Sequence, residues 1–209
     1  MMRTPEDEEK RKKILEGSRA LIFREGVSSL TMGDISSRLG ISKKTLYKYF
    51  SNKTQLVEET IEGKIEEIGA LIEAASRDAT RTFPERLGVI LGIVARQLAE
   101  LGETLVRDVS YREPQLWEKI DTFRREHIFT AITRLFEEGI RDGWVRTDIE
   151  SRLVPAMFVG AANAILNPSQ IFAMTAPPVV IFDTLIRILL GGILTEPGRR
   201  QLFVTEAKE

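Results

Sequence analysis

A short run of basic and aromatic residues is the part of this sequence best suited to binding another molecule. Residues 42–50 read SKKTLYKYF, and Leu46 and Phe50 lie four apart, the spacing at which two side chains share one face of a helix. The opposite face must then carry the rest of the run, which is Lys43, Lys44, Thr45, Tyr47, Lys48 and Tyr49. Cationic donors beside phenolic hydroxyls suit a phosphate backbone and the edges of bases. The run therefore predicts a helix whose exposed face binds nucleic acid.

The residues before this run predict the turn that positions it. Thr31 and Asp34 have the spacing of a capping box, in which two polar side chains satisfy free amides at the start of a helix. Gly40 can adopt the left-handed conformation that ends a helix, and Ser42 can cap the next one. The pattern predicts a helix-turn-helix over residues 31–50. The alternative is an ordinary solvated helical hairpin, but two tyrosines and a phenylalanine in one short helix favour the binding role.

The same segment resembles the DNA-binding domain of the tetracycline-repressor (TetR) family of bacterial regulators. In that family a threonine starts one helix, a glycine lies in the turn, and a Leu-Tyr-x-x-Phe pattern ends the reading helix before an Asn-Lys start of the fourth helix. The matching positions here are Thr31, Gly40, Leu46, Tyr47, Phe50, Asn52 and Lys53. The resemblance covers residues 1 to about 55. It implies a homodimer that binds a two-fold or pseudo-palindromic operator in double-stranded DNA and responds to a small-molecule effector.

The expected DNA contacts fall into two groups. We expect base edges at Lys44, Thr45 and Tyr47. We expect phosphate contacts at Thr31, Lys43, Lys48, Tyr49 and Lys53, with Ser42 completing the set at the start of the reading helix.

Charge is distributed unevenly along the chain. Residues 1–53 hold 12 Lys or Arg against 7 Asp or Glu, whereas the remainder holds 18 against 24, so a net charge of +5 is followed by one of −6. A basic head gains affinity for DNA by releasing counterions, and an acidic body is repelled from the duplex. The near-neutral total of −1 hides this polarity.

Composition argues against an enzyme. The chain has no cysteine and one histidine, and it shows no glycine-rich phosphate loop, nucleophile elbow or metal-ligand spacing. We therefore expect no cofactor, no metal and no catalytic residue. The resemblance implies a transcriptional regulator, and specifically a repressor, in the cytoplasm. Two alternatives stay open, a non-inducible or architectural DNA-binding protein and, more distantly, a helical enzyme or ligand carrier.

Helix signals run through the whole chain and predict an all-α fold of about nine helices. We expect a three-helix DNA-binding domain over residues 1–53 and a helical effector-binding and dimerisation domain over residues 54–209. Ser51 is expected to cap a long fourth helix, and residues 114–142 are expected to form one seventh helix. Thr147 and Glu150 have capping-box spacing and predict the start of the eighth.

The last two expected helices carry more apolar residues than one core can use. Residues 178–194 are apolar almost all round, but Asp183 and Arg187 argue against a membrane span, so we expect a soluble helix and no membrane partner. The alternatives are a dimer interface and the central helix of a monomer. By resemblance, the interface would contain Leu153, Met157, Gly160, Ala161, Ala164, Phe182, Leu185, Leu189 and Gly192.

The sequence offers candidate residues for an effector site. By resemblance it lies in the helical body, and the candidate lining residues are Phe83, Arg96, Tyr111, Trp117, Phe123, His127 and Asn163. Mostly apolar walls with few polar groups would favour a hydrophobic or aromatic small molecule. The alternative is that Trp117 and Phe123 belong to the core and His127 is an ordinary helix residue.

Overall fold

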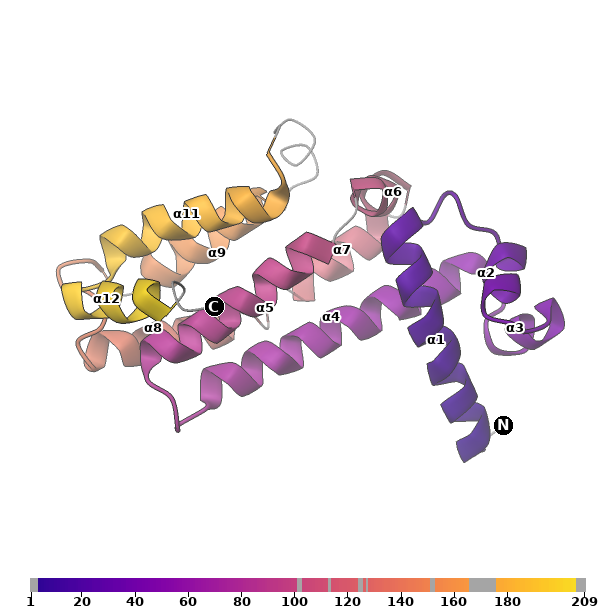
Figure 1. Cartoon of the computed structure of the whole chain (residues 1–209), viewed down its shortest axis with the longest axis horizontal. Coiled ribbons are helices and arrows are strands. Elements are labelled where there is room, and N and C mark those ends of the chain that lie inside the picture. The colour runs from indigo at the N-terminus through magenta and orange to yellow at the C-terminus, as the bar shows by residue number, and fades with distance from the viewer. Residues whose placement is uncertain are drawn as a thin grey trace. The chain divides into compact units, whose positions relative to one another are not determined.

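The chain forms an all-helical protein in the part that the computed structural model describes, which is residues 4–100, 103–112, 114–123, 126, 128–150, 153–165 and 176–205. The helices in these ranges (Figure 1) are α1 (Pro5–Glu25), α2 (Met32–Arg38), α3 (Lys43–Tyr49), α4 (Lys53–Arg77), α5 (Phe83–Glu100), α6 (Glu103–Arg112), α7 (Pro114–Phe123), α8 (Phe129–Arg141), α9 (Leu153–Ile165), α11 (Pro178–Ile193) and α12 (Glu196–Thr205). The all-α prediction is confirmed, although these ranges hold eleven helices rather than about nine. In the same ranges, strand-like pairing is limited to one isolated bridge between Val145 and Leu194.

The helix count differs for identifiable reasons. The expected seventh helix is divided into α7 and α8. The expected start at Thr147 is wrong, since residues 147–149 form a bend and α9 begins at Leu153. Within that bend the guanidinium of Arg146 binds both carboxylate oxygens of Asp148, at 2.9 and 2.6 Å. Helix α12 was not expected from the sequence; Pro197 lies in its first turn, where a proline is well tolerated.

Two compact units divide the chain, and the first holds the predicted DNA-binding segment. It consists of Met1–Glu66 together with Glu100–Ile120, so α6 and most of α7 belong to it. Its core brings side chains of α1 to α4 together with side chains of α6 and α7. The largest contributors are Ile22, Leu30, Ile35, Leu46, Phe50 and Leu56, joined by Leu105, Val109 and Leu116. The contacts thus cross the expected boundary after residue 53, and the functional division at that residue stays a prediction.

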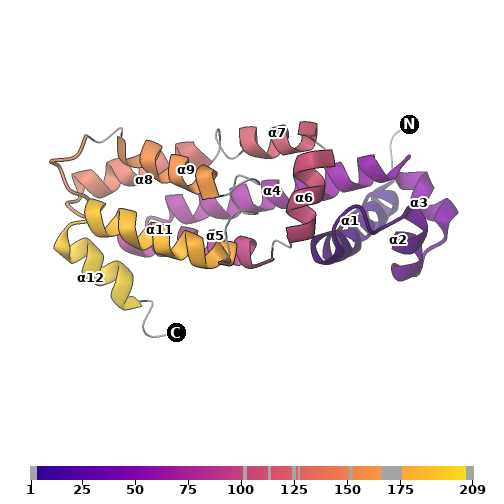
Figure 2. The ribbon, with the colours of Figure 1, turned by 90° about the horizontal axis from the view of Figure 1, so that it is seen from above.

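The second unit consists of Glu67–Ala99 and Asp121–Glu209. Within it α9 packs on both α8 and α11, and Figures 1 and 2 both show α9 and α11 side by side. The ring of Phe136 on α8 lies 5.6 Å from that of Phe83 and 5.7 Å from that of Phe158, measured between centroids. Aromatic rings at this separation stabilise a core beyond the area that they bury.

None of the helices in the described ranges is both long and apolar enough to span a lipid bilayer.

Candidate nucleic-acid interface

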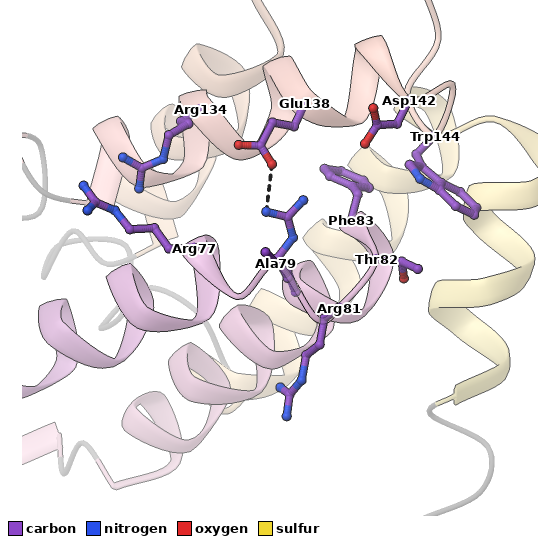
Figure 3. Close-up of a pocket in the computed structure, with 10 residues that line it drawn as sticks. Arg77, Ala79, Arg81, Thr82, Phe83, Arg134, Glu138, Asp142 and Trp144 are labelled. Atoms are coloured by element: carbon purple, nitrogen blue, oxygen red, sulfur yellow. Dashed lines mark ion pairs between the residues drawn. The ribbon is translucent and has the colours of Figure 1, made fainter.

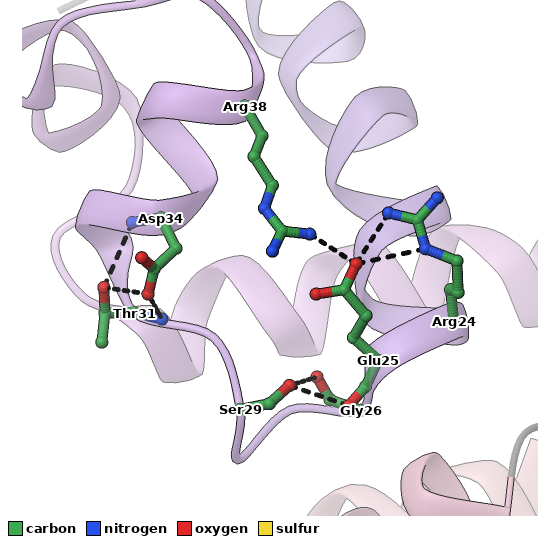
Figure 4. Close-up of polar contacts among 7 residues, drawn as sticks. All are labelled: Arg24, Glu25, Gly26, Ser29, Thr31, Asp34 and Arg38. Carbon is green, nitrogen blue, oxygen red and sulfur yellow. Dashed lines mark hydrogen bonds and ion pairs between the residues drawn. The ribbon is translucent and has the colours of Figure 1, made fainter.

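Helix α2 is held at its start by a reciprocal cap (Figure 4). The hydroxyl oxygen of Thr31 accepts a hydrogen bond from the backbone N–H of Asp34 at 3.1 Å, and the carboxylate of Asp34 accepts one from the backbone N–H of Thr31 at 2.9 Å. The hydrogen bonds from Thr31 lower the pKa of Asp34, so the cap is ionised at neutral pH. The capping box predicted from the spacing is confirmed, and the hydroxyl of Thr31 forms part of it.

The turn that follows has the predicted geometry. Gly40 has a φ of +65°, a left-handed conformation that side chains disfavour. The hydroxyl oxygen of Ser42 then accepts a hydrogen bond from the backbone N–H of Thr45 at 3.0 Å and starts α3. Leu46 and Phe50 are fully buried below that helix. The backbone therefore places α3 in one orientation, with its opposite face outward.

The outward face of α3 is basic, as expected. Lys43, Lys44 and Lys48 are exposed, and Tyr47 keeps 51% of its surface accessible. Thr45 is half-buried beside them, and its hydroxyl lies 2.9 Å from that of Ser42. An exposed tyrosine between lysines on a rigid helix can donate hydrogen bonds to phosphates and reach base edges.

The expectation that Tyr49 is exposed is wrong. This side chain is only 6% accessible, and its hydroxyl donates a hydrogen bond to the carboxylate of Asp7 on α1 at 2.8 Å. The hydrogen bond to Asp7 and burial both raise the pKa of Tyr49. At the end of a seven-residue helix, position 49 turns under α3 and toward α1. Tyr49 therefore contributes to holding the reading helix in place.

Asp7 was not among the candidate residues, yet it meets two residues of α3. Its carboxylate also accepts a hydrogen bond from the ammonium of Lys48 at 2.7 Å. The contacts from Lys48 and then Tyr49 lower the pKa of Asp7 to about 2. Because the folded pKa is the lower one, the stability from these contacts is present above the ordinary value of 3.8 and is lost as the pH falls toward 2. Asp7 is consequently charged at every pH at which the protein would bind DNA.

The ammonium group of Lys53 forms hydrogen bonds within the protein. Its ammonium donates hydrogen bonds to the backbone oxygens of Val27 at 3.2 Å and Leu30 at 3.0 Å, in the segment that joins α1 to α2. The start of α4 is capped beside it by Asn52, whose side-chain oxygen accepts from the backbone N–H of Gln55 at 2.8 Å, so the expected Ser51 cap is wrong. Whether Lys53 also reaches a phosphate stays a prediction.

Replacing Lys53 by alanine separates these two roles. Because two carbonyl oxygens lose a charged donor, we expect Lys53→Ala to lower the free energy of unfolding by about 1–3 kcal/mol. Urea denaturation measures this loss, and Lys44→Ala, at an exposed site, is the matched control with unchanged stability. Unchanged stability together with a salt dependence of DNA binding that is shallower by about one unit would instead assign Lys53 to a phosphate.

A second set of contacts fixes the segment between α1 and α2 (Figure 4). Glu25 at the end of α1 pairs with Arg24 at 2.7 Å and with Arg38 at the end of α2. Those two arginines, Arg24 first, lower the pKa of Glu25. The hydroxyl of Ser29 donates to the backbone oxygen of Glu25 at 2.8 Å. These bonds tie the two helices that support α3 to each other.

Helix α6 reaches the same segment through a long-range contact. The carboxylate of Asp108, only 5% accessible, accepts hydrogen bonds from the backbone N–H of Ser28 at 2.6 Å and from its hydroxyl at 2.5 Å. Gly26 has a φ of +80°, and a Cβ there would approach Thr104 of α6 to 2.5 Å. Only glycine permits α6 to pack this closely. Asp108 and Ser28 lie 80 residues apart, and no local pattern pointed to the pair.

Three of the expected effector residues pack into the interior. Phe83 is 1% accessible and contacts Phe136. Trp117 is half-buried and packs against the core of the first unit. Phe123 is half-buried and lies over Gly69 of α4, where a Cβ would overlap its ring. For Trp117 this packing corresponds to the core role that was kept as the alternative.

Of the other four expected effector residues, the structure describes the side chains of two, and both are exposed. Arg96 is exposed on α5, and Tyr111 keeps 68% of its surface accessible on α6. His127 and the side chain of Asn163 lie outside the described residues. The effector site inferred from resemblance therefore stays a prediction without a shared cavity among the residues that the structure describes.

The second unit contains a hollow of about 680 Å³ where the end of α4, the start of α5 and α8 meet (Figure 3). Of the expected effector residues that the structure describes, Phe83 alone lines it, and its walls combine charged side chains with apolar ones. The lining residues are Arg77, Ala79, Arg81, Thr82, Phe83, Arg86, Arg134, Glu138, Asp142 and Trp144. All of these arginines are ion-paired, including the buried Arg86, which pairs with Glu138 at 2.7 Å. This is not the mostly apolar pocket that was expected.

The residues expected at a dimer interface divide into exposed and buried sets. Leu153 and Met157 on α9 are each 49% accessible, and Gly160 and Gly192 are exposed. Ala161, Leu185 and Leu189 are half-buried, and the side chain of Ala164 is outside the described residues. Phe182 is 4% accessible and so lies in the core of the single chain, and its place at a dimer interface stays a prediction. Two exposed apolar residues were missed, Val180 at 50% and Ile188 at 71%.

A capped helix, a tight glycine turn and a second capped helix with a basic outer face define a helix-turn-helix DNA-binding protein. The family model described as "Bacterial regulatory proteins, tetR family" matches residues 14–60, which contain this unit. Residues 14–60 therefore form a DNA-binding segment of the tetR type.

Comparison of the whole chain supports this assignment. The chain is 25% identical over 185 residues to the uncharacterized HTH-type transcriptional regulator YvaF of Bacillus subtilis, covering 88% of this chain and 96% of that one. Among solved structures, a TetR-family regulator from Agrobacterium tumefaciens has a TM-score of 0.67 at 21% identity, covering 90% and 99% of the two chains. FadR from Bacillus subtilis in complex with stearoyl-CoA has a TM-score of 0.60 at 19% identity, covering 87% and 98%. At these identities the solved structures show a shared fold.

Proposed function

We infer that the protein is a homodimeric transcriptional repressor that blocks an operator until a small hydrophobic effector binds its helical body. The outward face of α3, with Lys44 and Tyr47 at its centre, is the observation that carries this function. A helix held by Ser42 at its start and by Leu46 below can enter a major groove without reordering. The cytoplasm, where operator DNA is accessible, is the proposed place of action.

Dimerisation would supply the second reading helix. The apolar residues exposed on α9 and α11, which are Leu153, Met157, Val180 and Ile188, form the proposed dimer face. Large apolar side chains gathered on adjacent helices are typical of a surface that another protein covers. A two-fold axis through this face would present two copies of α3 to a two-fold operator.

The contact between Asp108 and Ser28 supports a route for the effector signal. Helix α6 follows α4 and α5 in the chain. The carboxylate of its residue Asp108 nevertheless binds Ser28, in the segment that precedes α2. A change in α6 would therefore reach the helix-turn-helix directly, in addition to any movement of α4. To convert an equilibrium from 99:1 to 1:99, the effector needs about 5.5 kcal/mol of differential affinity for the two states.

The complex of Bacillus subtilis FadR with stearoyl-CoA supports a long-chain acyl thioester as the first effector to test. Such a molecule joins an apolar chain to an anionic head group. The arginine-lined hollow of the second unit offers guanidinium groups, and Arg81 at its rim is 47% accessible. Its volume of about 680 Å³ lies within the usual range of small-molecule sites.

Two measurements test the proposed function. Selection from genomic fragments followed by fluorescence anisotropy is expected to yield a two-fold operator bound more tightly than random duplex DNA. Stearoyl-CoA is expected to release that DNA and to raise the melting temperature, because it stabilises one conformation. Tight operator binding without response to acyl thioesters, fatty acids or steroids would favour the non-inducible alternative. Absence of DNA affinity with substrate turnover would favour the enzyme or carrier.

A further inference from the structure

The contact between Asp7 and the reading helix joins two bonds of different character. The bond from the hydroxyl of Tyr49, at 2.8 Å, lies at a buried side chain and fixes the end of α3 against α1. The bond from the ammonium of Lys48, at 2.7 Å, lies at the surface, where the side chain of Lys48 is 61% accessible. The first bond can position α3, whereas the second neutralises one of the three lysines on its outward face.

We propose that Asp7 is an internal competitor of the DNA phosphates for Lys48 and sets operator affinity below the value that the basic face would otherwise reach. The proposal rests on the DNA-binding role of α3 proposed above. Asp7 would then be an affinity-determining residue that lies on α1, outside the helix-turn-helix itself.

The electrostatics support competition and not mere positioning. A phosphate that approaches the Lys48 ammonium must come close to a carboxylate that already occupies one side of it, and the two anions repel each other. The positive charge of Lys48 is also balanced by Asp7 before DNA arrives, so binding there releases little of the counterion atmosphere that drives association. Because contacts from Lys48 and Tyr49 keep the pKa of Asp7 low, acidification to mildly acidic pH does not remove the competitor.

Asp7→Asn tests the proposal on the full-length protein. The asparagine oxygen can still accept the Tyr49 hydrogen bond, while the charge is removed. Binding to a random-sequence duplex is measured by anisotropy in potassium chloride between about 50 and 200 mM. We expect affinity at about 0.1 M salt to rise about three- to eight-fold and the salt dependence to steepen by about 0.9 unit, the contribution of one further phosphate contact.

Three variants make the result specific. Glu9→Gln is the matched control, since it removes one negative charge from α1 at a residue that pairs with Lys13 at 2.7 Å and not with α3. Its gain in affinity measures the effect of net charge alone and should be well below that of Asp7→Asn. Lys48→Ala combined with Asp7→Asn should abolish the steeper salt dependence. Tyr49→Phe removes the positioning bond and should lower the melting temperature without steepening the salt dependence.

The outcomes separate this proposal from the proposed function. Wild-type protein that fails to bind any duplex at low salt would overturn the DNA-binding role itself. Wild-type binding with an Asp7→Asn protein that matches the wild type, weakens, or gains no more than Glu9→Gln would overturn the competition and leave Asp7 a positioning residue. A folded Asp7→Asn protein is verified by an unchanged circular dichroism spectrum.

Discussion

A protein with both Met157 and Ile188 replaced by arginine is expected to sediment as a monomer and to lose operator binding. The wild-type side chains are 49% and 71% accessible on α9 and α11, where the proposed dimer face lies. Two arginines would place unpaired charges in the centre of an apolar interface, which costs far more than the lost contacts. Because each α3 would then bind its half-site alone, we expect operator affinity to fall by about a hundred- to ten-thousand-fold.

The control for this experiment is Leu71→Arg, at an apolar residue of α4 that is 47% accessible and outside the proposed dimer face. That variant should remain a dimer with wild-type operator affinity. Sedimentation at micromolar concentration decides the question. A double-arginine protein that is still dimeric would place the interface elsewhere, and a well-folded wild-type monomer would remove it altogether.

The adjacent residues Leu46 and Tyr47 are expected to respond in opposite ways to alanine. Leu46 is completely buried, so Leu46→Ala should lower the free energy of unfolding by about 2–5 kcal/mol. Since small domains are stable by only about 5–15 kcal/mol, much of the DNA-binding unit would melt at growth temperature. Tyr47→Ala should change stability by less than about 0.5 kcal/mol and weaken operator binding by about 1–3 kcal/mol.

Urea denaturation and operator binding on the same two proteins distinguish the core from the reading face. Because Leu46 faces the core and Tyr47 faces outward, the large loss of stability should occur only in Leu46→Ala, and Tyr47→Ala should lose operator affinity while it keeps its stability. If Tyr47→Ala unfolded the protein, or left operator affinity at the wild-type value, the outward face of α3 would not be the DNA contact.

The sequence was most informative where structure depends on neighbours a few residues apart. The capping box of Thr31 and Asp34, the left-handed Gly40 and the Ser42 cap each follow from local hydrogen bonding or sterics, and all are present. The helical periodicity also predicted correctly that Leu46 and Phe50 are buried in the core. The capping box expected of Thr147 and Glu150 was wrong, because residues 147–149 form a bend and α9 begins only at Leu153.

Contacts between distant residues could not be derived from one sequence. Tyr49 was expected outside because its angular position on α3 is intermediate, and the deciding partner, Asp7, lies 42 residues earlier. Asp108 and Ser28 are 80 residues apart. The effector residues could not be settled from the sequence either, since apolar side chains at helical spacing give the same pattern in a core and around a ligand, as Phe83 and Trp117 illustrate. Their expected roles derived from resemblance and not from geometry.

The packing of α6 and α7 into the core around α1 to α4 limits how this regulator could be recombined. Leu105, Val109 and Leu116 are buried against the helix-turn-helix, although they follow it by more than fifty positions. A chimera that grafted residues 1–53 onto an unrelated sensor would leave the apolar surface beneath these three side chains in water. In evolutionary terms the DNA-binding segment cannot be exchanged alone between proteins, because it must be inherited together with α6 and α7, which complete its core.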